Sequence, residues 1–148
     1  MPDIRPANAD LLQEITQFQA ITTDRLGINL TDAPASIVEK IRDRISEIRD
    51  DGIELDEDNR AGLAVVLAEQ YIRQFGWHRA EVNFKDDYDD THYVACVLIA
   101  DNSLAIAPVW WISDILDGEK SNGILLNFNL VAANQVPVAD AGQALLLH

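Results

Sequence analysis

The chain contains little cysteine and no long apolar run. Cys96 is the only cysteine among 148 residues, which excludes an internal disulfide and a cysteine-rich metal site. No apolar run approaches the roughly 20 residues that a membrane span needs, and the first residues lack the apolar segment of a secretory signal. We therefore expect a cytoplasmic protein that has no cofactor and no contact with a membrane.

Basic residues are scarce, above all in the C-terminal part. Residues 86–148 carry nine acidic residues and a single base, Lys120, whereas residues 1–85 carry sixteen acidic residues and ten bases. Binding to nucleic acid depends on Lys and Arg that neutralise phosphates, so a formal net charge of -14 argues against it. The same field would attract a basic protein partner. The alternative is that the charge only keeps a small protein soluble and monomeric.

The length and composition predict one domain over residues 1–148. The sequence is 48% hydrophobic and 24% charged, as is typical of a globular protein. Residues 1–33 should form a first helix, from Ala9 to Thr23 with Asn8 as its cap, and a connector. A second helix is expected over 34–49, with a cap from 31–33 and a proline in its first turn.

Residues 57–116 form the predicted core unit, a long helix followed by a three-stranded meander and a short helix. Asp56 should cap the long helix and Gly76 should end it. We expect this helix to be central and to pack on the meander through three of its apolar side chains. The expected contacts run from Leu67, Tyr71 and Phe75 to Val82, Val94, Cys96 and Leu98. The expected elements are a helix over 57–75, strands over 77–84, 92–100 and 104–107, and a helix over 109–116.

The fold class that follows is α+β, with N-terminal helices packed on a small antiparallel three-stranded meander and short helices after it. Residues 123–134 fit both a strand and a helix, and we favour a helix capped by Ser121 or Asn122. The apolar end of the sequence, Ala144 to Leu147, should dock on the body or on another copy of the chain. The sequence does not decide between a monomer and a homodimer.

The segment 62–116 resembles a family of uncharacterised small bacterial domains. The resemblance rests on the order helix, Gly-Trp, meander and Pro-Trp helix, and on two runs of residues. These runs are Leu67, Tyr71, Phe75, Gly76 and Trp77, and Pro108, Val109, Trp110 and Trp111. The resemblance implies the fold of this unit and transfers no activity and no functional residue.

The sharpest polar cluster is the loop between the first two predicted strands, which carries four acids around a tyrosine. We interpret it as a solvated hairpin loop or as a partner-binding surface. A Ca²⁺ site is a third hypothesis for this loop, but its acidic residues lack the spacing and the glycine of an EF-hand loop. The residues are Asp86, Asp87, Tyr88, Asp89 and Asp90.

Tryptophans supply the remaining candidates for binding. Trp110 and Trp111 are adjacent on a short helix, so one of them, Trp110, should be partly exposed and could anchor a partner. Trp77, Tyr93 and Trp111 are candidates for a pocket between the meander and the helices. No glycine-rich phosphate loop is present, and the sequence shows no arrangement of a nucleophile with a histidine and an acid.

The function that the sequence favours is that of a non-enzymatic, acidic interaction protein. Its partner would be a basic protein, and its role would be inhibitory or immunity-like. The alternative is a small-ligand binding or scaffold domain that uses the pocket above. A third hypothesis is that the protein is an unrecognised hydrolase. Such an enzyme would need catalytic side chains that come together only in three dimensions.

Overall fold

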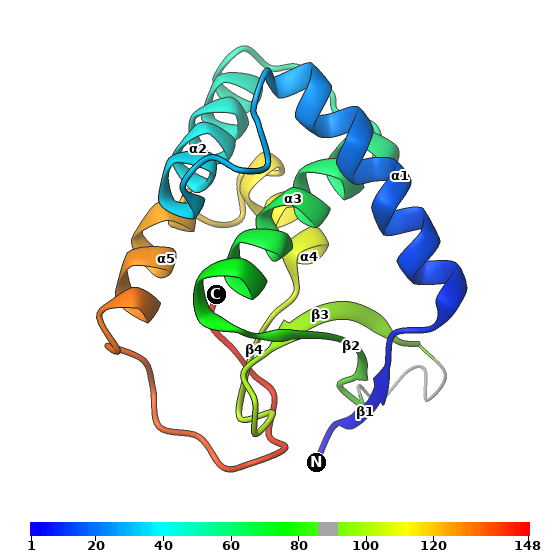
Figure 1. Ribbon diagram of the computed structural model, residues 1–148. Coiled ribbons are helices and arrows are strands. Elements are labelled where there is room, and N and C mark those ends of the chain that lie inside the picture. The colour runs from blue at the N-terminus through cyan, green and yellow to red at the C-terminus, as the bar shows by residue number, and fades with distance from the viewer. Residues whose placement is uncertain (86–91) are drawn as a thin grey trace.

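The computed structural model describes residues 1–85 and 92–148 and has the predicted α+β architecture, with helices gathered on one side of a sheet (Figure 1). In these two ranges no helix combines the length and the apolar character that crossing a bilayer requires. The helices are α1 (Ala9–Leu26), α2 (Pro34–Asp50), α3 (Glu57–Phe75), α4 (Pro108–Leu116) and α5 (Ile124–Ala132). The strands are β1 (Asp3–Pro6), β2 (His78–Asn83), β3 (Val94–Leu98), β4 (Leu104–Ile106) and β5 (Leu145–Leu146).

The sheet has more strands than the sequence predicts. The predicted meander is present as β2, β3 and β4, but in the part of the chain that the structure describes β1 and β5 extend it to five strands in the order β1-β2-β3-β4-β5. β1 pairs antiparallel with β2, and β5 pairs parallel with β4, so the sheet is mixed. The end of the sequence therefore docks on the body, as expected. β5 has only two residues, so it shows no periodicity in the sequence. β1 contains Pro6, which is tolerated because this strand lies at an edge of the sheet.

Helix boundaries follow the capping residues where the cap is a side chain. The side chain of Asn8 accepts a hydrogen bond from the Leu11 amide at 2.8 Å, and Asp56 accepts one from the Asn59 amide at 2.9 Å. Gly76 adopts the left-handed conformation at φ 71° and ends α3. These predictions are confirmed.

One predicted cap is wrong. Helix α2 has its N-cap at Ala33, within the predicted residues 31–33, although no side chain caps it, and Pro34 occupies the first turn as expected. Residues 124–132 form the favoured helix, α5, but its N-cap is Gly123 and not Ser121 or Asn122. Asn122 is used elsewhere, because its amide donates to the Arg42 carbonyl and to Ser46 Oγ, both at 2.8 Å. Asn122 thus ties α5 to α2.

Helix α3 is central, as predicted, and contacts α1, α2, α4 and β3. Its predicted partners on the sheet are wrong, however. Leu67 and Tyr71 belong to the main core with Val97, which β3 turns toward the helices. The other apolar side chains expected beneath α3 form a second, smaller core on the opposite face of the sheet, because side chains alternate along a strand. These residues are Val82, Val94, Cys96 and Leu98.

Candidate functional site

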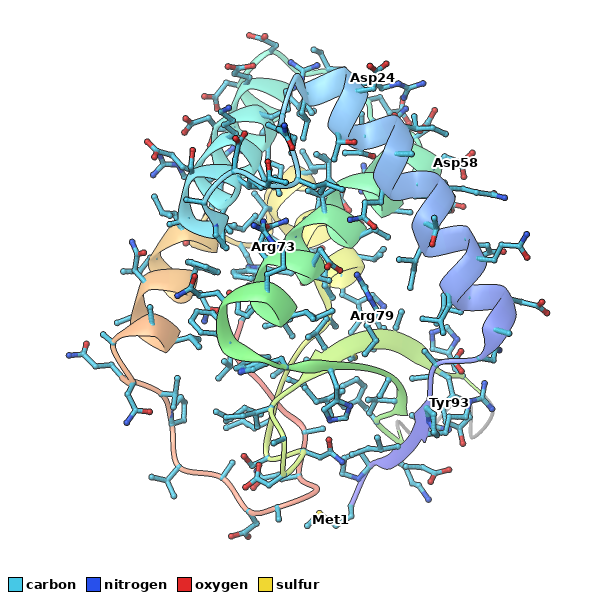
Figure 2. The ribbon with its side chains drawn as sticks, viewed as in Figure 1. Met1, Asp24, Asp58, Arg73, Arg79 and Tyr93 are labelled. Atoms are coloured by element: carbon cyan, nitrogen blue, oxygen red, sulfur yellow. The ribbon has the colours of Figure 1, made fainter. Side chains whose placement is uncertain are left out.

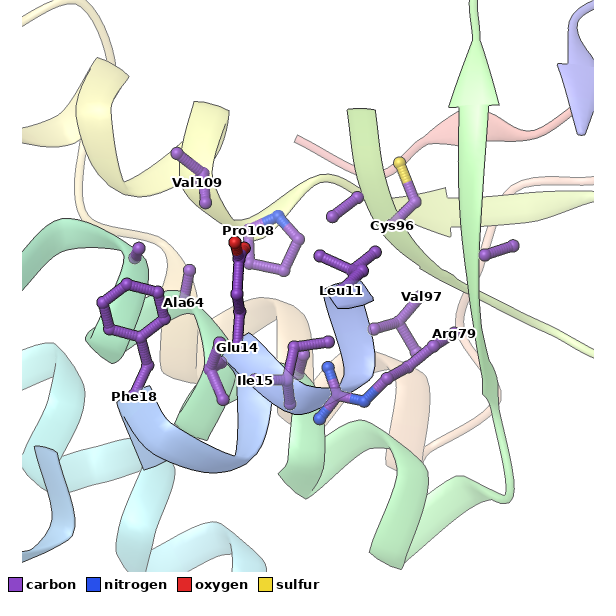
Figure 3. A pocket seen from close by; sticks show the side chains of 15 residues that line it. Leu11, Glu14, Ile15, Phe18, Ala64, Arg79, Cys96, Val97, Pro108 and Val109 are labelled. Carbon is purple, nitrogen blue, oxygen red and sulfur yellow. The ribbon is translucent and has the colours of Figure 1, made fainter. Parts of the chain in front are cut away.

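A mostly apolar pocket of about 130 Å³ lies between the N-terminal part of α1 and the rest of the fold (Figure 3). Residues of α1 and α3 form two of its walls, and β2, β3 and the start of α4 complete it. The apolar side chains that line it from α1 are Leu11, Ile15 and Phe18.

The pocket exists because α3 presents small side chains to α1. Ala61, Ala64 and Ala68 recur at three- and four-residue spacing, so they share one face of the helix, and all three line the pocket. Alanine fills little space, and the larger side chains of α1 do not close the gap. Thr22 is the only residue of α1 that is buried, so α1 is the least embedded of the three long helices.

Among the described residues, two charged side chains line the pocket, and they differ in their partners. Arg79 of β2 pairs with Glu69 of α3 at 3.0 Å, so its charge is compensated. Glu14 extends from α1 across the pocket toward Pro108 (Figure 3). Within residues 1–85 and 92–148 no Lys, Arg or His forms an ion pair with Glu14. The uncompensated charge at this pocket is therefore negative.

An acidic groove adjoins the pocket along the first turn of α3 and one side of α4. Ala61 and Val109 line both the groove and the pocket, so the two form one continuous surface. Arg60 is the basic residue of the groove, and it faces Asp117 at 3.4 Å. The acidic residues that line the groove are Glu54, Asp56, Glu57, Asp58 and Asp117.

Most of the acids in the groove are free to act on a partner. Asp56 is occupied as the cap of α3. Glu54, Glu57 and Asp58 are exposed, and in the part of the chain that the structure describes none of the three has an ion-pair partner. Asp58 lies at the surface near α1 (Figure 2). Favourable placement at the positive end of the α3 dipole explains why these charges are tolerated together.

Trp110 is partly exposed, at 37% of its surface, as predicted. Its ring packs on Phe84 at 5.6 Å between centroids and lies nearly parallel to the His92 ring at 6.5 Å. Phe84 and His92 flank the acidic loop on either side in the sequence. The predicted partner-binding residues of the acidic loop lie outside the described residues; they are Asp86, Asp87, Tyr88, Asp89 and Asp90. Their role in partner binding and the hypothesis of a Ca²⁺ site therefore remain predictions.

Within the described residues, the ring contacts and side-chain hydrogen bonds of the three residues predicted to line a pocket, Trp77, Tyr93 and Trp111, are made with other residues. Trp77 is buried and packs on Tyr71 at 5.3 Å. Tyr93 directly precedes β3, and its hydroxyl donates a hydrogen bond to Asp3, which raises the pKa of Tyr93. None of the three residues lines the pocket under α1.

Trp111 is buried and stacks on the imidazole of His148, with 4.9 Å between the ring centroids. Nε2 of His148 accepts a hydrogen bond from the Ala107 amide at 3.2 Å. Burial lowers the pKa of His148 to about 4, so the ring is neutral at pH 7. A second contact holds the same segment, because the amide of Asn127 donates to the Leu147 carbonyl. Trp111 thus serves to dock the C-terminal segment.

Cys96, His78 and His92 are side chains of types that can take part in catalysis, and each has a defined environment. Burial raises the pKa of the Cys96 thiol to about 12, so the thiol stays protonated near neutral pH. Nε2 of His78 lies 2.7 Å from Asn102 Oδ1, and His92 lies against Trp110. Outside residues 86–91, no three His, Cys, Asp or Glu side chains are grouped so that they could hold a metal ion.

Comparison with known proteins yields no relative. Neither the protein-family models, nor the curated proteins, nor the solved structures include a match to the chain. The resemblance to small bacterial domains stays a prediction. The class that the structure defines is an α+β domain with a mixed five-stranded sheet.

The sequence does not single out Glu14, Val109 or the alanines of α3 as site residues. The available signal is the spacing of Ala61, Ala64 and Ala68, which marks a face of small side chains on an otherwise bulky helix. That spacing predicts a close helix contact as readily as a pocket. The pocket itself depends on the path of α1.

Proposed function

We propose that this protein is a non-enzymatic, acidic interaction protein that binds a basic protein partner, with an inhibitory or immunity-like role. The observation that carries the proposal is the continuous surface formed by the apolar pocket under α1 and the acidic groove beside it. Val109, which is 37% exposed, lies where the two meet. Trp110 follows it on α4 and offers a partly exposed aromatic ring.

The two halves of this surface would act at different distances. Uncompensated acids attract a basic partner over about a Debye length and raise the rate of encounter. The apolar pocket contributes only after contact, when side chains of the partner displace water from it. Interfaces commonly combine an apolar centre with a charged rim in this way. The formal net charge of -14 acts in the same direction as the groove.

The pocket also supports small-ligand binding as a second candidate function. Its lining is largely apolar and concave, which is the property that distinguishes such sites. Its volume of about 130 Å³ is well below the roughly 300–1,000 Å³ of ordinary ligand sites. That size suits one side chain better than a whole ligand and favours the protein-partner function.

The proposal is tested by quantitative pull-down from a native lysate at low and at high salt. The tagged parent is compared with a groove variant, Glu54→Gln combined with Glu57→Gln. The parent should capture a basic protein at low salt and lose it at high salt, because salt screens exposed charges. The groove variant should capture several-fold less of the same protein.

A matched variant controls for net charge. Asp24→Asn combined with Asp140→Asn removes the same two charges from exposed positions that line neither the pocket nor the groove. This control should capture as much partner as the parent. If the parent captures no salt-sensitive protein, or if both double variants lose it equally, the proposal is wrong.

A further inference from the structure

We propose that the pocket under α1 receives one lysine or arginine side chain of the partner, with the aliphatic stem against the alanine face of α3 and the charged head on Glu14. This inference rests on the proposed function and names the chemistry that the surface recognises. The pocket provides two kinds of environment along its length, apolar walls and a carboxylate that extends across it (Figure 3).

The apolar part fits an unbranched aliphatic chain. The space is lined by Ile15 and Phe18 of α1, by Ala64 and Ala68 of α3, and by Val109 of α4. Lys and Arg carry stems of three or four methylenes that bury well against apolar surface while the charged head stays near solvent. A cavity of roughly 150 Å³ holds a molecule the size of benzene, so about 130 Å³ accommodates such a stem.

The charge at the pocket selects the head group. Arg79 does not oppose a cation strongly, because Glu69 lies 3.0 Å from its guanidinium. Glu14 has no ion-pair partner in the described ranges, 1–85 and 92–148, and it is exposed. A bound ammonium or guanidinium would therefore supply the missing counter-charge. A carboxylate would be repelled, and an uncharged chain would gain only the apolar contact.

The groove explains why the occupant is a residue of a basic protein and not a free amine. Glu54, Glu57 and Asp58 line the groove that adjoins the pocket at Val109, so they continue the acidic surface beyond it. One small amine reaches only the pocket. A protein that inserts one basic side chain can place further basic residues along the groove, and these contacts together favour the larger partner.

The test is a titration followed by NMR of the full chain. The probes are the acetylated N-methylamides of lysine, arginine, norleucine and glutamate. Norleucine keeps the four-carbon chain of lysine and lacks its charge. The lysine and arginine probes should shift the methyl signals of Leu11, Ile15 and Val109 in a saturable way. The norleucine probe should bind several-fold more weakly, and the glutamate probe should cause no shift.

Three variants separate the contributions. Glu14→Gln should weaken the lysine probe by roughly two- to fivefold, as expected of a partly exposed ion pair, and leave the norleucine probe unchanged. Asp24→Asn removes a charge from the same helix outside the pocket and should have no effect. Ala61→Leu should fill the pocket and abolish binding of both probes, with circular dichroism and the melting temperature confirming that the variant folds.

Several results would overturn the inference. They are the absence of any saturable shift with the lysine or arginine probe up to its solubility limit, equal binding of the norleucine and lysine probes, and an unchanged lysine affinity in Glu14→Gln. Equal binding of norleucine would identify an apolar ligand site. These failures differ from failure of the proposed function, because the salt-sensitive capture through Glu54 and Glu57 is measured independently.

Discussion

Gly62 of α3 lies directly against Thr22 of α1. A Cβ atom added at Gly62 would come within 2.0 Å of Oγ1 of Thr22 and 3.4 Å of its Cβ. This contact packs α1 against α3, and α1 carries Glu14 and one apolar wall of the pocket. The position of the site therefore depends on a glycine outside it.

We predict that Gly62→Ala destabilises the protein even though alanine is the better helix former. The helix gains up to about 1 kcal/mol from the exchange, whereas overpacking a close contact costs about 1–3 kcal/mol. Denaturant unfolding measures the difference. The double variant Thr22→Ala with Gly62→Ala removes the hydroxyl and should recover the loss. If Gly62→Ala is as stable as the parent, the helices are not in close contact.

The sequence predicts those elements of the fold that have strong local signals. Asn8 and Asp56 mark helix starts because their side chains accept hydrogen bonds from backbone amides, and Gly76 marks a helix end through its left-handed conformation, so these ends are confirmed. The face of a strand that packs on a helix is not a local property. Val97 and its neighbours Cys96 and Leu98 are all apolar, and only the pairing of the strands decides which of them faces α3.

The candidate site was only partly predictable for the same reason. The exposure of Trp110 follows from its position beside Trp111 on one short helix, and the structure confirms it. Glu14 and Ala61 lie far apart in the sequence and meet only because α1 crosses α3. Neither has a neighbouring residue that marks it as functional. A pocket between two helices becomes visible only when their relative path is known.

Leu67 should be one of the most costly residues to truncate. It is completely buried on α3 in the main core. Leu67→Ala removes its burial and leaves a cavity, so a loss of about 2–5 kcal/mol is expected. Denaturant unfolding provides the measurement. A loss under about 1 kcal/mol would mean that α3 is not central.

Stability should fall below pH 6.5 because of His148. Burial holds its folded pKa at about 4, below the ordinary value of 6.5. Between these values the unfolded chain binds a proton that the folded chain does not, so falling pH favours unfolding. His148→Phe keeps an aromatic ring on Trp111 and does not titrate. The parent should lose more stability than this variant between pH 7 and pH 5, and equal losses would contradict the lowered pKa of His148.

Trp110 should contribute to partner binding more than its exposure alone suggests. Partly exposed tryptophans are frequent binding hot spots, and their truncation often reduces affinity more than tenfold. We expect Trp110→Ala to reduce capture of the basic partner about tenfold in the pull-down. Leu126→Ala is the control, because Leu126 is 64% exposed on α5 and lies outside the proposed surface. Equal capture by the two variants would remove Trp110 from the interface.

Photo-crosslinking at Val109 tests the central claim most directly. Val109 lies where the apolar pocket meets the acidic groove, and Val138 is a fully exposed valine that lines neither. Each is replaced in turn by p-benzoylphenylalanine and irradiated in native lysate at low and at high salt. The proposal predicts a discrete adduct with a basic protein at position 109 that is lost at high salt and absent at position 138. No such adduct at position 109, or the same adduct at both positions, would contradict it.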